Sequence, residues 1–328
     1  MASCQRVERE FPQHNGELSL RFEIDDMSSV QTKAVDPDGL GIQKVTLYCF
    51  DAYGLFIATS TIKTSDFMPE HQNPSQGGLF KITVPPHTEI VHIVCNQNIQ
   101  NFSESYFHNK SEYEVMSELE ASAGRMIYWA RHTMDELAEI DAQGGVVKLL
   151  RNQAKITVEV KQGVPFEVEG FIVTHTSAFG TVAPYKLETA EFVAPSLADP
   201  FVTIPDGNVL LSDFQDVRGM IEEYVFESVN AIDNPVNVIV KGSYNGGPSL
   251  YYRVIIMDDD GYQLPLLRNY HYRVIIADEL SYGQTDFESS LTAAATNNVW
   301  ITIEDHIPEV HGLTHVLKVD EKVSTASS

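Results

Sequence analysis

The chain has 328 residues, of which 43% are hydrophobic and 10% aromatic, so it is long enough to bury two sizeable cores. Its 46 Asp and Glu residues against 22 Lys and Arg give a formal net charge of −24, which argues against nucleic acid as a partner. No apolar run reaches the ~18 residues that a membrane-spanning helix needs.

The first residues have the pattern of a lipoprotein processing site. Ala2 and Ser3 stand directly before Cys4, as a lipoprotein signal peptidase requires before the cysteine that becomes acylated. We therefore expect Cys4 to be a lipidation site and the chain's link to a membrane. The alternative is a chance cysteine in an ordinary N-terminus.

A strictly alternating segment follows this tether. Leu18, Leu20, Phe22 and Ile24 are each separated by one polar residue, which places all four on one face of an extended strand. Burying each such side chain stabilises a fold by roughly 1.5 to 3 kcal/mol. Removing this leader strand is therefore expected to leave an open hydrophobic groove.

The segment after the leader strand, residues 27–41, has no hydrophobic periodicity and is rich in Ser, Thr, Asp, Pro and Gly. Such composition is typical of an exposed loop that is open to proteolysis. Lys33 is its one basic residue, and Ala34 follows it.

The rest of the chain predicts mostly strands. A single helical stretch is expected over 111–142, where Val115, Leu119, Met126 and Met134 recur at roughly helical spacing. The alternative is an interruption of this helix near Gly124, and Gly144 and Gly145 then offer a boundary. Strands are expected at 42–50, 54–61, 80–84 and 89–96, and then at 146–160, 166–174, 190–194, 223–229, 236–244, 250–257, 270–278 and 299–304.

Many short strands separated by turn residues are typical of antiparallel β-sandwiches. We therefore predict a mostly β chain of two antiparallel β-sandwich domains, with one helical insertion in the first. The expected division is a tether and removable strand at 1–33, an N-terminal domain at 34–145, a C-terminal domain at 146–305 and a tail at 306–328.

Two further cysteines, Cys49 and Cys95, fall in predicted strands of the first domain. They could pair with each other or stay as two buried thiols, since a domain of this size needs no disulfide.

Motifs of catalysis are absent from the sequence: it has no Gly-x-Ser-x-Gly, His-Glu-x-x-His, Walker loop or Cys-x-x-Cys. We therefore predict neither an enzyme nor a bound cofactor. His132 and Glu136 could share a metal from one face of the predicted helix, but two ligands alone favour a solvated helix face.

Two other patterns have both a structural and a binding interpretation. The acidic run at 258–261 lacks the spacing of a calcium loop, which favours a hairpin turn. A group of five tyrosines could form a sugar-binding face or pack within sheets: Tyr251, Tyr252, Tyr262, Tyr270 and Tyr272.

One block occurs twice in the chain. The sequence Leu-Leu-Arg-Asn stands at 149–152 and again at 266–269, each time before a predicted strand. Together with Gly-Phe-Ile-Val at 170–173, Gly-Thr-Val-Ala-Pro-Tyr at 180–185, Val-Thr-Leu-Tyr-Cys-Phe-Asp at 45–51 and the Cys4 block, these residues resemble the fimbrillin family, the subunits of type V pili on certain anaerobic gram-negative bacteria.

The resemblance implies sandwiches of transthyretin-like topology, export as an outer-membrane lipoprotein, and removal of the first strand by a trypsin-like protease. Cleavage would fall between Lys33 and Ala34, where the family's protease typically prefers arginine. A strand from a neighbouring subunit would then fill the emptied groove by β-augmentation.

The C-terminus offers a candidate for such a donor strand. Leu313, His315, Leu317 and Val319 alternate with other residues and have no obvious partner in their own chain. The alternative is a last strand of the second domain with a frayed tail.

The implied function is a structural subunit of a bacterial surface fimbria. Its expected partners are other copies of itself or related pilus subunits, a processing protease, a host or bacterial surface ligand and, through lipid on the precursor, the outer membrane. Two alternatives are a lipid-retaining pilus anchor or accessory subunit, and a glycan-binding surface lipoprotein.

Overall fold

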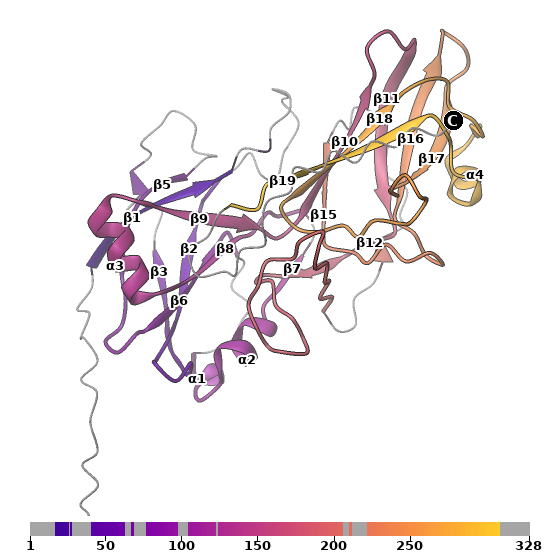
Figure 1. The fold of residues 1–328 in the computed structure, drawn as a ribbon. Helices are drawn as coiled ribbons and strands as arrows, with labels where there is room; N and C mark the ends of the chain where they lie inside the picture. The colour runs from indigo at the N-terminus through magenta and orange to yellow at the C-terminus, as the bar shows by residue number, and fades with distance from the viewer. Residues whose placement is uncertain are drawn as a thin grey trace, which may run out of the picture.

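The computed structural model describes residues 17–25, 27, 41–62, 67–68, 77–97, 104–122, 124–205, 210–211 and 222–308. Figure 1 shows an elongated molecule in which two strand-rich halves follow one another, and the prediction of a mostly β chain is confirmed. Among the described residues, no helix is long and apolar enough to cross a bilayer.

An eight-stranded sheet forms the N-terminal half, in the order β3-β2-β6-β8-β9-β1-β5-β4. Its strands are β1 (Glu17–Ile24), β2 (Val45–Phe50), β3 (Phe56–Ile62), β4 (Phe67–Met68), β5 (Gly77–Thr83), β6 (Ile90–Cys95), β8 (Tyr128–Thr133) and β9 (Val146–Arg151). Side chains of β1, β5 and β9 share one hydrophobic core with those of β2 and β6, so the sheet closes around that core.

The C-terminal half contains two larger sheets. One has the order β15-β10-β18-β19 and the other β11-β16-β17, and side chains of both build a second core. The strands are β10 (Ala154–Val160), β15 (Glu222–Val225), β18 (Tyr270–Ile276), β19 (Val299–Asp305), β11 (Phe166–Thr174), β16 (Asn237–Tyr244) and β17 (Leu250–Ile255); a short helix α4 (Phe287–Thr292) packs beside β17.

The expected boundary at 145/146 is wrong, because the predicted strand 146–160 is two strands in different sheets. β9 pairs with β8 and β1 in the first half, whereas β10 pairs with β18 in the second. Between them, Asn152 accepts a hydrogen bond from the backbone N–H of Ile127 and Gln153 donates one to the carbonyl of Arg125. The chain therefore passes from the first sheet to the second at residues 152–153.

The single helix predicted over 111–142 is also wrong. The segment forms α2 (Glu112–Ser117), β7 (Glu120–Ser122), β8 and α3 (Met134–Gln143), and α1 (Glu104–Phe107) precedes them. Tyr128, Trp129 and Ala130 are all buried, because β8 lies inside the sheet with both of its faces covered. A strand buried on both faces lacks polar alternation, and its apolar residues matched helical spacing by coincidence.

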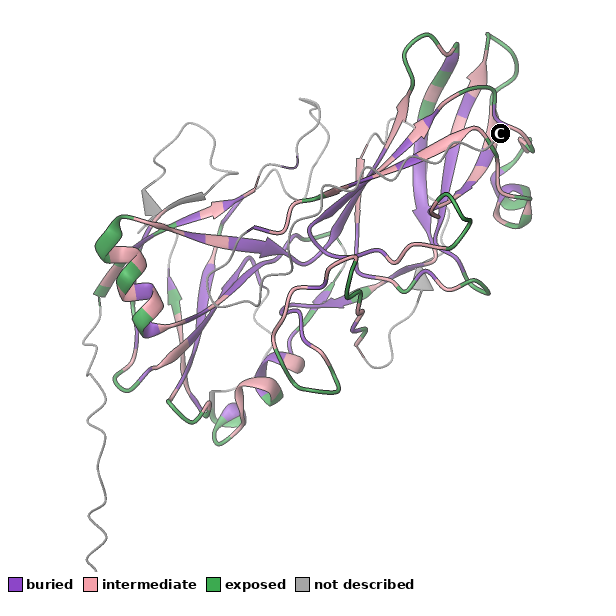
Figure 2. Ribbon diagram, in the orientation of Figure 1, coloured by how far each residue is buried: buried purple, intermediate pink, exposed green. Residues whose placement is uncertain are grey.

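The two halves meet through a third buried cluster. Val182 and Phe226 from the C-terminal half pack with Trp129 and Leu150 from the first sheet, as Figure 2 shows by the continuous buried colour through the middle of the molecule. The two-stranded pair β13 (Phe179–Thr181) and β7 also crosses this junction. A second small pair joins β12 (Thr176–Ser177) to β14 (Leu210–Leu211).

Residues 190–194, expected to be a strand, form only an isolated bridge between Lys186 and Glu191. Their ring residue, Phe192, instead lies against the His92 and Trp129 rings at centroid distances of 4.8 and 6.3 Å. Packing at the junction therefore decides the conformation of this segment.

Cys49 and Cys95 are both free and fully buried. In the β2/β6 ladder, Cys95 stands opposite Val45 and Cys49 opposite Val91. The two cysteines are thus four positions out of register, about 13 Å apart along the strand, which is beyond the reach of about 7 Å that a disulfide allows. Burial raises the pKa of the Cys49 thiol to about 12.

Candidate functional site

The leader strand β1 lies inside the eight-stranded sheet, between β5 and β9. It pairs antiparallel with β5 from Glu17 to Glu23 and parallel with β9 from Arg21 to Ile24. Over Arg21–Glu23 both edges of the strand therefore have a neighbour. Without β1, the sheet would present two unpaired strand edges facing each other across a gap.

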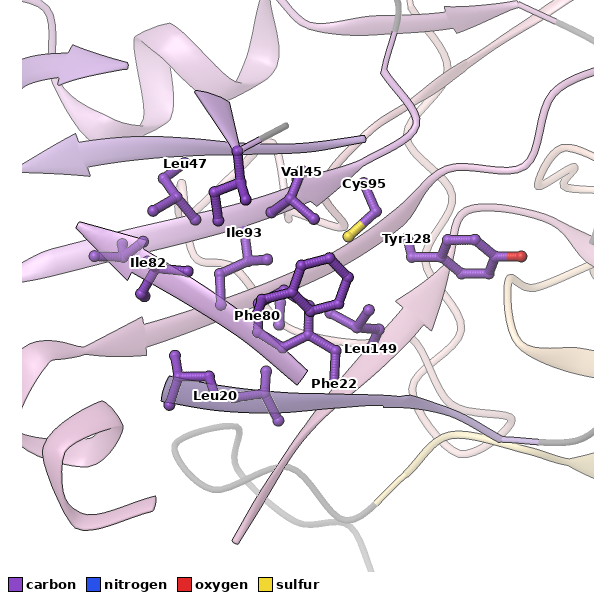
Figure 3. Close-up of a cluster of buried hydrophobic side chains, with 14 of the residues drawn as sticks. Leu20, Phe22, Val45, Leu47, Phe80, Ile82, Ile93, Cys95, Tyr128 and Leu149 are labelled. Atoms are coloured by element: carbon purple, nitrogen blue, oxygen red, sulfur yellow. The ribbon is translucent and has the colours of Figure 1, made fainter. Parts of the chain in front are cut away.

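The apolar face of β1 enters the core of the N-terminal half. Leu20, Phe22 and Ile24 are 0%, 1% and 3% exposed, and Leu18 packs against the same cluster from a half-buried position. Figure 3 shows Leu20 and Phe22 beside Phe80 and Leu149, and the Phe22 and Phe80 rings stack at 4.6 Å. The strand is thus part of the core and does not merely cover it.

Basic side chains hold the far end of the leader. Lys148 on β9 pairs with Glu23 and lies 3.7 Å from a carboxylate oxygen of Asp25. Partial burial, which lowers the pKa of Lys148, is outweighed by these two carboxylates, so its pKa is raised.

Two further side chains, one from each half of the molecule, bind the backbone that follows β1. The Arg151 guanidinium donates to the backbone carbonyl of Asp25 at 2.6 Å. Lys155 on β10, 1% exposed, donates to the carbonyl of Met27 at 2.9 Å and pairs with Glu222 at 2.7 Å. The segment that leaves β1 is therefore fastened to both sheets.

This arrangement is suited to strand replacement. The three nearly fully buried side chains contribute roughly 5 to 9 kcal/mol at ~1.5 to 3 kcal/mol each, which compares with a total stability of about 5 to 15 kcal/mol for an average domain. Only another extended segment can satisfy both ladders and refill the apolar positions, because the partners on each side are backbone groups.

The sequence matches curated proteins of known type. Over 276 residues it is 21% identical to the major fimbrium tip subunit FimE of Porphyromonas gingivalis, covering 80% of this chain and 48% of the relative. This chain is a relative of the fimbrillins. It spans about half the length of the curated relatives that it matches, and no protein-family model matches it.

Two solved structures of similar proteins cover 88% of this fimbrillin relative. A fimbrial assembly protein from Parabacteroides distasonis is 15% identical with a TM-score of 0.48 over 96% of its chain. The tip fimbrial protein Mfa3 from Porphyromonas gingivalis is 13% identical with a TM-score of 0.48 over 100% of its chain.

Of the residues predicted for lipidation, cleavage, the leader strand and the donor strand, the structure places the four apolar residues of the leader strand, which share one face of β1. The others lie outside the described residues: the lipidation candidate Cys4, the cleavage pair Lys33 and Ala34, and the candidate donor residues Leu313, His315, Leu317 and Val319.

The prediction that His132 and Glu136 lie on one solvated helix face is wrong. His132 lies on β8 and is 2% exposed, while Glu136 is in the first turn of α3, where its carboxylate caps the backbone N–H of Thr133. The Nδ1 atom of His132 is 3.5 Å from the Glu136 carboxylate, and no group of three metal-ligating residues in the described chain includes them. Their spacing marks a strand-to-helix junction.

The other two candidates serve the fold of this fimbrillin relative. Asp258 accepts hydrogen bonds from the backbone N–H groups of Asp260 and Tyr262, which makes the acidic run a turn. Tyr252, Tyr270 and Tyr272 are buried in the second core, whereas Tyr262 is 69% exposed. The tyrosines are therefore not gathered on one open face.

Sequence reasoning missed the basic residues that hold the leader. Arg151 belongs to the first Leu-Leu-Arg-Asn block, which marked it without revealing its role. Lys148 and Lys155 carried no signal, because their partners, Asp25 and Met27, lie more than a hundred residues earlier in the chain.

Proposed function

We propose that this chain is a structural subunit of a bacterial surface fimbria, and that it polymerises by donor-strand exchange after proteolytic removal of its N-terminal strand. The observation that carries the proposal is the position of β1, which is interior to the sheet and built into the core, yet joined to the rest by the segment that contains Lys33. Relatives that are named as fimbrial subunits support the same role.

In this proposal Cys4 carries lipid on an outer-membrane precursor, and cleavage between Lys33 and Ala34 releases the leader at the cell surface. Arg21 is the poorer protease site, because its backbone is paired on both sides. The two cores correspond to two sandwich domains of transthyretin-like topology. The partners are a processing protease, other pilus subunits and a surface ligand.

The donor candidate in the tail can be compared with β1 position by position. Both segments alternate and end on an acidic residue, Asp25 after Ile24 and Asp320 after Val319, but the tail has His315 among its three apolar positions. In the register that matches these acids, Val319 stands at the place of Ile24 and Leu317 at that of Phe22. An acid at the place of Asp25 would face Lys148.

The same register places polar residues of the tail where its own groove does not suit them. His315 would occupy the fully buried position of Leu20, and Lys318 would replace Glu23 opposite Lys148. Sliding the tail by two residues instead brings His315 to the place of Phe22 or Glu321 to that of Ile24. We therefore favour a related subunit over an identical copy as the chain's neighbour in the fimbria.

The decisive experiment compares the full chain with a chain that starts at Ala34. We expect the shortened chain to be much less stable and to recover when a synthetic peptide of residues 16–28 is added. A matched peptide with Leu20→Ser and Phe22→Ser has the same charge and is expected to fail. Equal stability of the two chains without peptide would contradict the proposal.

A second measurement reads processing directly, from the N-terminal sequence and intact mass of the protein on its native cells. A start at Ala34 supports the polymerising subunit. A start at acylated Cys4 would instead favour a lipid-retaining anchor or accessory subunit. The alternative of a glycan-binding lipoprotein is not favoured, because three of the five tyrosines that would form the sugar-binding face are buried in the second core.

A further inference from the structure

Three metal-ligating side chains meet where β18 and β19 approach the junction of the two halves. They are His271, Glu304 and His306, and one nitrogen or oxygen atom of each lies within 4.8 Å of the others. Glu304 stands directly opposite His271 in the antiparallel ladder. Two ligands are thus placed by strand pairing, which is a rigid support.

The third ligand is held just beyond the end of β19. The backbone N–H of His306 donates to the carbonyl of Asn269, and the Asn269 side chain donates to the carbonyl of His306 at 2.7 Å. The Nε2 atom of His306 is buried and has no hydrogen-bond partner. A buried nitrogen that makes no hydrogen bond and faces a carboxylate and a second imidazole has a free lone pair or N–H that a metal ion or a proton can satisfy.

The spacing suits a small tetrahedral ion. The Glu304 Oε2 atom lies 3.3 Å from His271 Nδ1 and 3.6 Å from His306 Nε2. Two ligand atoms each about 2.0 to 2.2 Å from a tetrahedral zinc ion are about 3.3 to 3.6 Å apart. The separations of both histidine nitrogens from Glu304 therefore fit one shared ion, and the two nitrogens, within 4.8 Å of each other, need to approach by at most about 1.5 Å.

Outer contacts orient two of the three ligands. The Nε2 atom of His271 lies 2.8 Å from the Thr157 hydroxyl, so this nitrogen can hold the proton while Nδ1 faces the ion. Arg273 donates to the other oxygen of Glu304 at 3.0 Å, which leaves Oε2 turned toward the two rings. Such secondary contacts are typical of metal sites.

Nearby cations are already neutralised by other carboxylates. Lys155 pairs with Glu222 at 2.7 Å, and both Arg273 nitrogens Nε and Nη2 bond Glu159 at 2.8 and 2.5 Å. With Glu304 included, three carboxylates face two cations here. The net charge of the surroundings is therefore negative, which favours a bound cation.

We infer that His271, Glu304 and His306 form a binding site for a divalent transition metal, of which Zn²⁺ is the best fit. Two imidazoles and one carboxylate suit zinc, whereas calcium and magnesium prefer oxygen ligands. The Glu304 side chain is 40% exposed, so the ion can enter and water can take the fourth position. The inference stands apart from the proposed function, although the bound ion would fasten the start of the C-terminal tail to the second sheet.

The test is titration of the tag-free full chain with Zn²⁺, and with Co²⁺ as an optical probe of the same site. We expect saturable Zn²⁺ binding with a raised melting temperature, and visible Co²⁺ bands of a tetrahedral site. Neither Mg²⁺ nor Ca²⁺ should compete. His306→Gln and Glu304→Gln should each weaken the binding at least about tenfold, and Thr157→Val, which removes only the outer contact, by about 10- to 100-fold.

The control is His108→Gln, which removes an exposed histidine far from the cluster in sequence and should leave the binding unchanged. Melting curves without metal verify that each variant folds. The inference is overturned if the full chain shows no saturable Zn²⁺ binding. It is equally overturned if His306→Gln and Glu304→Gln, folded, bind Zn²⁺ and Co²⁺ as the unchanged chain does.

Discussion

Glu112, at the start of α2, is linked through His92 to the buried Trp129 by a chain of hydrogen bonds. The Trp129 indole donates to His92 Nδ1 at 3.0 Å, and His92 Nε2 lies 2.8 Å from a Glu112 oxygen. Because Nδ1 accepts, the His92 ring carries its proton on Nε2 and donates it to Glu112. Arg131 adds two hydrogen bonds to the same carboxylate.

These contacts give Glu112 a measurable effect on stability against pH. Burial, which raises its pKa, is outweighed by the bonds from His92 and Arg131, so the pKa is held at about 2 instead of the usual 4.5. A lowered pKa means stabilisation that is complete above pH 4.5 and is lost as the pH falls toward 2.

We therefore expect Glu112→Gln to lower the free energy of unfolding at pH 7, by on the order of 3 kcal/mol, and to flatten the pH dependence between 4.5 and 2. Denaturant unfolding at several pH values measures both effects. The control is Glu118→Gln, which breaks a half-buried pair with Lys110, less buried than Glu112, and should cost under about 1 kcal/mol. A variant as stable as the unchanged chain at pH 7 would contradict this account.

Among the elements, β1 carries the largest share of the functional argument. On its inward face Leu20, Phe22 and Ile24 are buried, while Glu17, Ser19 and Arg21 are exposed, so one strand separates packing from solvent contact at alternate positions. An outward residue such as Ser19 can therefore change with little effect, whereas the buried inward ones cannot.

A cavity substitution tests this division. Phe22→Ala should lower the free energy of unfolding by about 3 to 5 kcal/mol, because the ring that stacks on Phe80 is lost from a packed core. Ser19→Ala, on the exposed face of the same strand, should change it by under about 0.5 kcal/mol. Similar losses from both variants would mean that β1 is not anchored by its apolar face.

At the scale of the whole molecule, the two Leu-Leu-Arg-Asn blocks meet at the junction of the halves. Asn269 from the second block accepts a hydrogen bond from the backbone N–H of Arg151 in the first. Arg268, 1% exposed, pairs with Glu227 at 2.7 Å and donates to the carbonyl of Val182. The repeated block therefore builds the junction, which the sequence repeat alone did not reveal.

Close packing across this junction makes a further prediction. A Cβ atom on Gly180 would lie 2.2 Å from the Phe226 ring, so Gly180→Ala must displace that ring and should cost about 1 to 3 kcal/mol of stability. Combining it with Phe226→Ala, which removes the obstructing ring, should cost clearly less than the sum of the two single changes. Strict additivity in unfolding measurements would show that the two residues do not meet.

What the sequence by itself determined is local or compositional. The alternation of Leu18, Leu20, Phe22 and Ile24 predicted β1, because a strand with one buried face repeats every two residues. The mostly β class followed from the many short strands in the same way. The repeated blocks and short motifs supported the resemblance to fimbrillins, which the comparison with FimE bears out.

Only the tertiary structure decided which strands became neighbours. β8 was mistaken for helix because the first core covers one of its faces and the junction cluster covers the other. The domain boundary was misplaced because β9 pairs back with β1, although Glu23 and Lys148, which are in contact, are 125 residues apart in the chain. The cluster of His271, Glu304 and His306 likewise depends on β18 pairing with β19. The local sequence determines whether a segment prefers to be a strand. Which strand it pairs with, and which of its faces are buried, depends on segments that are distant in the sequence.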